Sequence, residues 1–165
     1  PDLQGTYPSY FIYGPIVFSS ASQLFLGGLN NAAAALSAMA SPLALRRADR
    51  PAFPGEELVV ISSPFFPHKL SIGYSQAQSR VVESVNGVKI RSLSHLVATL
   101  RDAKDEFLVL EFAGRRFETL VFPRKEMMAA TEEILNDNGV RAQGSPDLLA
   151  VWNLKGTTPT TAGSQ

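Results

Sequence analysis

The sequence contains no cysteine, only two histidines and no surplus of charge of either sign. Without cysteine there is no disulfide framework, no cysteine nucleophile and no thiolate metal site, although this absence does not settle the compartment. Fifteen basic residues balance fifteen acidic ones, so the chain lacks the positive surplus that attracts nucleic acid or an anionic lipid surface. We therefore expect no nucleic-acid partner.

Long apolar runs, metal-ligand spacings and phosphate-binding loops are also missing. The longest apolar stretch, Ala32–Leu45, is interrupted by two serines and a proline, so it does not predict a membrane span. His68 and His95 are far apart in the sequence and lack the spacing of a metal-ligand pair. Gly27-Gly28 is not followed by the lysine of a phosphate-binding loop. The sequence therefore predicts neither a metal nor a cofactor.

The chain also lacks the motifs of a protease active site. The segment from Gly73 to Ala77 is similar to a nucleophile elbow but does not have its final glycine. A catalytic triad requires a nucleophile, a base and an orienting carboxylate in mutual contact. We expect no catalysis within this chain, and an independent enzyme is the least favoured hypothesis.

The composition is suited to one packed domain with appendages. Hydrophobic residues make up 45% and charged residues 18% of the 165 residues, with ten phenylalanines, which indicates a globular chain rather than a disordered one. The chain opens at Pro1 without a methionine or a signal peptide. We therefore expect an excised fragment, with any targeting signal upstream of it.

The first half of the chain combines strands with an Ala-rich segment. Tyr10–Tyr13 and Ile16–Phe18 are rich in aromatic and β-branched residues and flank Gly14-Pro15, which predicts a strand, a turn and a second strand. Between about 22 and 48, alanine and leucine favour helix. Leu58–Ser62 is a short apolar run typical of a buried strand.

The middle of the chain carries the clearest local signals. Asn86-Gly87 lies between Val81–Val85 and Val88–Ile90, which predicts a tight hairpin turn. Ser92 follows as the N-cap of a helix. The apolar residues of this helix fall at helical spacing and form one stripe, made of Leu93, Leu96, Val97 and Leu100.

A second hairpin and two short helices complete the pattern. Phe107–Phe112 and Phe117–Phe122 flank a turn that contains glycine. A helix is predicted from about Lys125 to Asn136, with Gly139 placed to stop it, and Ser145-Pro146 begins a final helix. Hairpins and helices without regular βαβ alternation predict an α+β fold, a small and mostly antiparallel barrel or sandwich capped by helices.

The order of strand, Asn-Gly turn, short strand, capped helix and hairpin resembles the second half of a PDZ domain. The first half resembles a PDZ domain in the permuted order of bacterial and plant proteases, with Tyr13–Phe18 as the carboxylate-binding loop and its strand. The similarity is greatest to the last PDZ domain of plant-type Deg proteases, a branch of the Deg/HtrA serine proteases. Five segments carry it in order: Pro8–Phe18, Leu70–Tyr74, Val85–Leu96, Glu106–Phe112 and Gly139–Leu149.

The resemblance extends from Pro8 to Trp152 and implies how the chain is divided. We expect an N-terminal linker at residues 1–9, a PDZ-like domain at 10–152 and a disordered tail at 153–165. The domain would include the Ala-rich helical insert at about 22–48 and C-terminal helices at about 125–150.

The resemblance also implies a peptide-binding groove. The strand after the loop would pair with an extended peptide, and the helix after Ser92 would line the other side. His95 is either a contact for the ligand or a solvated residue at the helix start. The implied groove residues are Tyr13, Gly14, Pro15, Ile16, Val17, Phe18, His95, Leu96 and Thr99.

Two features depart from the family pattern. Pro15 stands where relatives commonly have a small or apolar residue, and a proline removes one backbone N–H of the kind that binds a terminal carboxylate. The other departure is the Ala-rich insert. Both favour a closed groove over the capture of C-terminal peptides.

By resemblance, the chain is a non-catalytic part of a Deg/HtrA-type serine endopeptidase whose protease domain lies outside it. It would bind peptide or protein segments for substrate engagement, regulation or oligomer assembly. The alternative is a purely structural module with a closed groove, docking onto other domains or subunits, with a homo-oligomer as one outcome. The compartment would be the cell envelope in a bacterium or an organelle in a plant.

Overall fold

The fold is described from a computed structural model, in which residues 9–21, 57–74, 80–114 and 118–154 are placed. The Ala-rich segment at about 22–48 lies outside these residues, as do 115–117 and the tail after 154. The elements in chain order are β1 (Tyr10–Tyr13), β2 (Ile16–Ser20), β3 (Val59–Ile61), the short 3-10 helix η2 (Lys69–Ser71), β4 (Val81–Val85), β5 (Val88–Lys89), α4 (Leu93–Asp102), β6 (Phe107–Ala113), β7 (Leu120–Pro123), α5 (Arg124–Asp137) and α6 (Pro146–Asn153).

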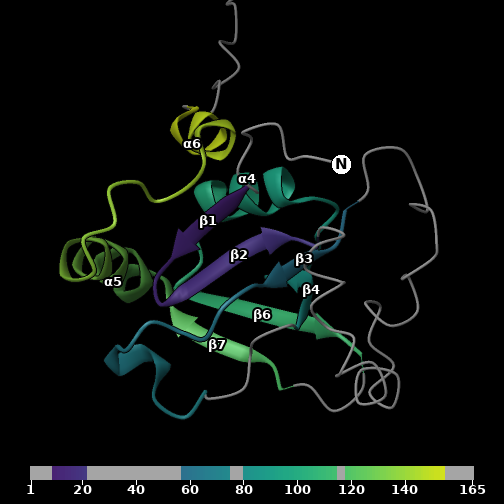
Figure 1. The fold of residues 1–165 in the computed structure, drawn as a ribbon. Helices are drawn as coiled ribbons and strands as arrows, with labels where there is room; N and C mark the ends of the chain where they lie inside the picture. The colour runs from purple at the N-terminus through teal and green to yellow at the C-terminus, as the bar shows by residue number, and fades with distance from the viewer. Residues whose placement is uncertain (1–8, 22–56, 75–79, 115–117, 155–165) are drawn as a thin grey trace, which may run out of the picture.

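Seven strands form one antiparallel sheet in the order β1-β2-β3-β4-β6-β7, and β5 pairs with β4 away from this path. Figure 1 shows α4 and α6 close together near β1, with α5 at one end of the sheet. The predicted α+β class is confirmed. The sheet remains open, whereas the sequence predicted a barrel or a sandwich.

The core lies between the sheet and α4. Along β6, Leu108, Leu110 and Phe112 are buried while Phe107 and Glu111 are exposed, which is the alternation of a strand covered on one face. The apolar stripe of α4 packs into the same core. These elements form where the sequence predicts them because each has one continuous apolar face.

The Asn-Gly turn is present and is fixed by the side chain of Asn86. Asn86 and Gly87 have φ values of 48° and 80°, as a two-residue hairpin turn of this type requires. The Asn86 amide donates to Asp105 Oδ2 (2.9 Å) and accepts from the Val109 N–H (2.7 Å). The turn is thereby attached to the start of β6.

The two strands at the ends of the sheet order, β1 and β7, are partly covered by other described residues. On β7, Pro123 has no N–H, and the Val121 carbonyl accepts a hydrogen bond from the Tyr74 hydroxyl at 3.4 Å. On β1, an isolated antiparallel bridge joins Phe11 to Gly144. Neither edge strand therefore presents a full row of unpaired backbone groups.

The 3-10 helix η2 was not predicted from the sequence. Its N-cap is His68, whose Nδ1 accepts from the Leu70 N–H (3.2 Å) and whose Nε2 lies 3.1 Å from Glu133 Oε2 on α5. Histidine is not among the usual N-cap residues, so the sequence carried no clear signal. The contact with Glu133 attaches this segment to α5.

Two negative findings hold for the described ranges. No helix in them combines the length and the apolar character needed to cross a bilayer. No group of three or more histidine, aspartate or glutamate side chains gathers there in a way that could hold a metal ion.

Candidate peptide-binding site

The predicted loop residues form the tight turn between β1 and β2. Tyr13 pairs with Ile16, so Gly14 and Pro15 are the two turn residues. Gly14 has a φ of 55°, a left-handed conformation that glycine adopts without steric cost. A Cβ at this position would lie 2.5 Å from Met127 Sδ on α5. The turn is therefore packed closely against α5.

Both backbone edges of β2 are already paired. On one side β1 runs antiparallel along it, and on the other side β3 pairs with its second half. The chain after β3 continues this second contact: the Ser62 N–H donates to the Val17 carbonyl (3.0 Å) and the Phe66 N–H to the Pro15 carbonyl (2.9 Å). An extended peptide can add to β2 only if one of these neighbours leaves.

The Gly14 N–H, which would face a ligand carboxylate, is already hydrogen-bonded within the domain. The Gly14 N–H donates to Thr131 Oγ1 at 2.7 Å in a buried position, and the Thr131 hydroxyl donates to the Met127 carbonyl at 2.8 Å. Pro15 has no N–H to contribute. The loop therefore directs its amide toward α5.

Burial divides the predicted strand residues into core and surface. The side chains of Tyr13, Ile16 and Phe18 are fully buried, whereas Val17 is half-buried. Burial raises the pKa of the Tyr13 hydroxyl, and the positive charge of Arg124 offsets only part of this effect. Tyr13, Ile16 and Phe18 are thus core residues in this structure.

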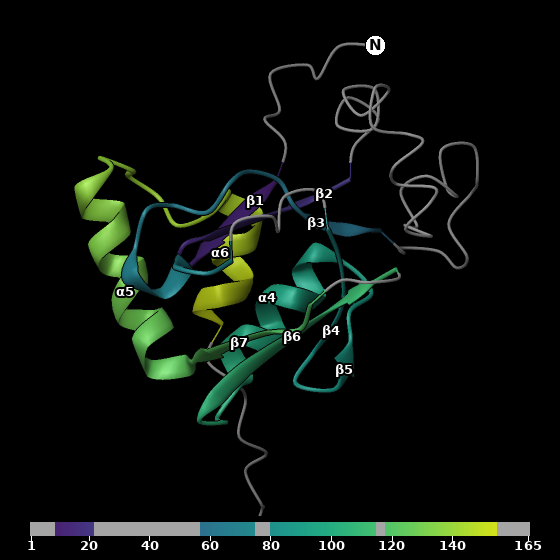
Figure 2. The ribbon, with the colours of Figure 1, turned by 90° about the horizontal axis from the view of Figure 1, so that it is seen from below.

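The surface between β1 and α4 is covered by α6. Trp152 packs against Phe11 and Tyr13, with ring centroids 5.2 and 6.0 Å away. Arg101 Nη1 on α4 donates to the Val151 carbonyl at 2.7 Å. Figure 2 shows α6 lying beside β1 when the domain is seen from below. The side of β1 that faces away from β2 is therefore occupied by the chain itself.

The three predicted residues of α4 do not share a face. Leu96 is fully buried in the core. His95 and Thr99 lie on a different face of the helix and line a pocket of about 500 Å³ together with Asn86 and Val88. The lining includes none of the predicted loop and strand residues, so the structure does not bring His95 and Thr99 together with that loop.

In this pocket the ring of His95 is held in one orientation. Its Nδ1 accepts from the Arg91 N–H at 3.1 Å, so neutral His95 carries its proton on Nε2. The Thr99 hydroxyl donates to the His95 carbonyl at 2.7 Å. With Val88 and Ala98 as apolar walls, the pocket has the size and the mixed lining that can hold a side chain of a protein segment.

The sequence-based prediction of the site includes neither Thr131 nor Trp152. Thr131 acts on Gly14 across 117 sequence positions, a separation over which local patterns carry no information. A signal did exist for α6, because Leu148, Val151 and Trp152 fall at helical spacing and form one apolar face.

Replacing Thr131 by valine is expected to lower the free energy of unfolding by about 1–3 kcal/mol. Valine keeps the shape of threonine but leaves the buried Gly14 N–H without its acceptor. Denaturant titration followed by circular dichroism would measure the loss. Serine at position 131 keeps the hydroxyl and should retain more of the stability; equal losses in both variants would show that packing, and not the hydrogen bond, is responsible.

Comparison with known proteins agrees with this architecture. The sequence profile of the PDZ domain matches residues 2–147. The chain belongs to the PDZ domain family. A relative of this PDZ domain is the putative protease Do-like 3, mitochondrial, of Arabidopsis thaliana, which is 26% identical over 140 residues, 85% of this chain. The match covers only 22% of the length of that protein.

Both comparisons confirm the resemblance to a PDZ domain of a Deg protease, and PDZ domains are non-catalytic modules. The profile match of this PDZ domain ends at residue 147, which is the second residue of α6. Nearly all of α6, including Trp152, thus lies beyond the residues that this profile matches.

Proposed function

We propose that this PDZ domain is a docking module of a Deg/HtrA-type serine endopeptidase, which holds domains or subunits of its parent together rather than capturing free C-termini. The pairing of both edges of β2 is the observation that supports this proposal. Capture of an extended peptide by strand addition needs a free strand edge and free loop amides. Here the edges are paired within the chain, and the Gly14 N–H is bonded to Thr131.

The free energy needed to open the groove would cancel most of the binding free energy of a peptide. Releasing β1 from β2 would expose Phe11, Ile12 and Tyr13, all of them buried. Burial of each such side chain contributes about 1.5–3 kcal/mol, and the broken ladder hydrogen bonds add to this cost. A peptide with a Kd of 1 μM gains only about 8 kcal/mol on binding. Displacing β1 would therefore consume nearly all of that gain.

A second candidate function is supported by the pocket on α4. His95 and Thr99, which the resemblance implies as ligand contacts, line this pocket with Asn86 and Val88. A segment of a protein substrate or partner could be held there by a side chain, without pairing to β2. This function would differ from docking in needing no second domain of the parent.

Titration of the 15N-labelled domain with peptides, each with a free or an amidated C-terminus, tests both candidates. We expect no saturable shift of the amide signals of residues 13, 14 and 16–18 with either set. Saturable shifts at those residues that require the free carboxylate would contradict the docking proposal. Shifts confined to His95, Thr99 and Asn86 would instead favour the second candidate. A PDZ domain with known affinity for one of the peptides serves as the positive control.

A further inference from the structure

The segment Gln143–Asn153 is attached to the rest of the domain as a separable unit. The helix before it ends in a hydrogen-bonded cap, in which the Gly139 N–H donates to the Asn136 carbonyl and the Val140 N–H to the Leu135 carbonyl. The connection 138–142 is largely exposed. The segment is therefore joined to α5 through a short connection that makes few contacts of its own.

The first part of this segment binds β1 as a strand binds its neighbour. The Ile12 N–H donates to the Gln143 carbonyl (2.7 Å) and the Ser145 N–H to the Tyr10 carbonyl (3.0 Å), while Gln143 Nε2 donates to the Ile12 carbonyl (3.0 Å). Gly144 allows this close approach, because a Cβ there would lie 3.0 Å from the Tyr10 carbonyl oxygen. Backbone pairing of this kind is a general mode of recognition between chains.

The second part binds as a helix in a groove. Leu148 is fully buried, and Trp152 packs against the aromatic rings of β1. At the start of the helix the Ser9 hydroxyl donates to Asp147 Oδ2 at 2.8 Å. Burial alone would raise the pKa of Asp147, but hydrogen bonds from Ser145, Ser9 and two backbone amides lower it overall. Strand pairing, apolar anchors and a polar contact at the rim together make a complete binding interface.

We propose that the face of β1 and α4 is an acceptor site for the Gln143–Asn153 segment of a second copy of this chain, which the chain's own segment fills in the isolated domain. This inference rests on the proposed docking function and names its partner. The same segment from a neighbouring copy would make identical contacts, so exchange changes little in energy apart from association.

A foreign peptide is a weaker candidate for this acceptor site. It must compete with a tethered segment whose effective concentration is on the order of millimolar. A second copy supplies the same contacts and receives a segment in return, so that only the cost of association opposes the exchange. In an assembly of several subunits, the local concentration of further copies favours the exchange.

Cysteine cross-linking can test the exchange, because the chain has no cysteine of its own. Ser9→Cys and Asp147→Cys place one thiol on each side of the interface, where the native side-chain oxygens are 2.8 Å apart. The two single variants are unfolded together, refolded at high concentration and treated with a short bifunctional maleimide. We expect a cross-linked dimer well above the level of random contact, because exchange places α6 of one copy on the β1 side of another.

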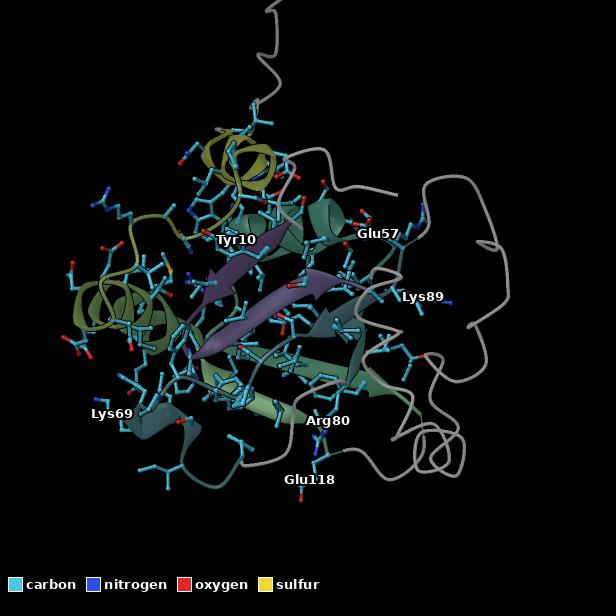
Figure 3. All side chains as sticks on the ribbon, in the orientation of Figure 1. Tyr10, Glu57, Lys69, Arg80, Lys89 and Glu118 are labelled. Atoms are coloured by element: carbon cyan, nitrogen blue, oxygen red, sulfur yellow. The ribbon has the colours of Figure 1, made fainter. Side chains whose placement is uncertain are left out.

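Two controls fix the interpretation. The double variant carries both thiols in one chain and must cross-link readily, which establishes the reach of the reagent. A mixture of Asp147→Cys with Lys89→Cys reports random contact, since Lys89 on β5 lies well away from Tyr10 and α6 in Figure 3. An amount of cross-linked dimer several-fold above that of the control mixture supports the proposal. An amount no greater than in the control mixture overturns it.

The failure of this inference and the failure of the docking function give different results. Without exchange, the single variants cross-link no more than the Lys89→Cys mixture. Sedimentation at rising concentration, or binding to other domains of the parent, can still reveal docking through another surface. If instead the domain captures free C-termini, the peptide titration reports it at residues 13–18, whatever the cross-linking shows.

Discussion

Alanine at position 14 is expected to destabilise the domain by about 2–5 kcal/mol, the sum of left-handed backbone strain and overpacking. Gly14 has a φ of 55°, and an added Cβ would lie 2.5 Å from Met127 Sδ and 2.8 Å from its Cε. Met127 is fully buried, so its side chain has little room to move away. Denaturant titration with a constant m-value would measure the loss.

Gly139→Ala is the matched control for this substitution. Gly139 has a similar φ of 63°, but no atom lies within 4 Å of the position that its Cβ would take. This variant should therefore show the backbone strain alone, about 1–2 kcal/mol. Equal losses at positions 14 and 139 would mean that the contact with Met127 does not restrict the loop. Shortening Met127 to alanine in the Gly14→Ala background would test the same contact by double-mutant coupling.

Leu148→Ala is expected to weaken the packing of α6 against the rest of the domain by about 2–4 kcal/mol. Leu148 is the one residue of α6 that is fully buried, and its removal leaves a cavity between the helix and the core. Trp152 is the only tryptophan of the chain, so its fluorescence reports directly on whether α6 remains on β1. We expect a red shift of its emission at denaturant concentrations that leave the far-ultraviolet circular dichroism of the sheet unchanged.

Leu154→Ala provides the comparison for this variant. Leu154 follows α6 and is 61% exposed, and exposed positions of this kind change stability by no more than about 0.5 kcal/mol. If Leu148→Ala left both the emission and the unfolding midpoint as they are in Leu154→Ala, the apolar anchor would not hold α6 in place.

Much of the fold could be predicted because its signals are local. The Asn86-Gly87 turn, the cap at Ser92 and the alternation along β6 are each contained in a few neighbouring residues. The predicted helix from about Lys125 to Asn136 is α5, which spans Arg124–Asp137. Patterns of this length are sufficient because a single apolar face decides both the period and the burial of each element.

The arrangement of the site could not be predicted in the same way, because its contacts are long-range. The partners of β2 are β1, only a turn away, and β3, about 40 residues further along the chain. The acceptor of the Gly14 N–H is still more distant in sequence. No local pattern shows whether a strand edge is free, and this decides whether a peptide can bind.

The residues of α4 show a second reason why the site could not be predicted from the sequence. The helical spacing predicts the apolar stripe that includes Leu96, whereas the family resemblance implies Leu96 and Thr99 as residues of the groove. In the structure the stripe faces the core, and His95 and Thr99 therefore lie on another side of α4. The predicted set from residues 13–18 and α4 remains a prediction as a ligand site, and the structure divides its members between two places.

The partial covering of β1 and β7 has a consequence for how this domain behaves when crowded. An exposed strand edge is a template on which other chains polymerise into fibrils. Here Pro123 and Tyr74 reduce the number of free backbone groups on β7, and Gln143–Ser145 cover part of β1. Copies that meet through β1 or β7 therefore find few free backbone groups through which their sheets could join into a continuous cross-β stack.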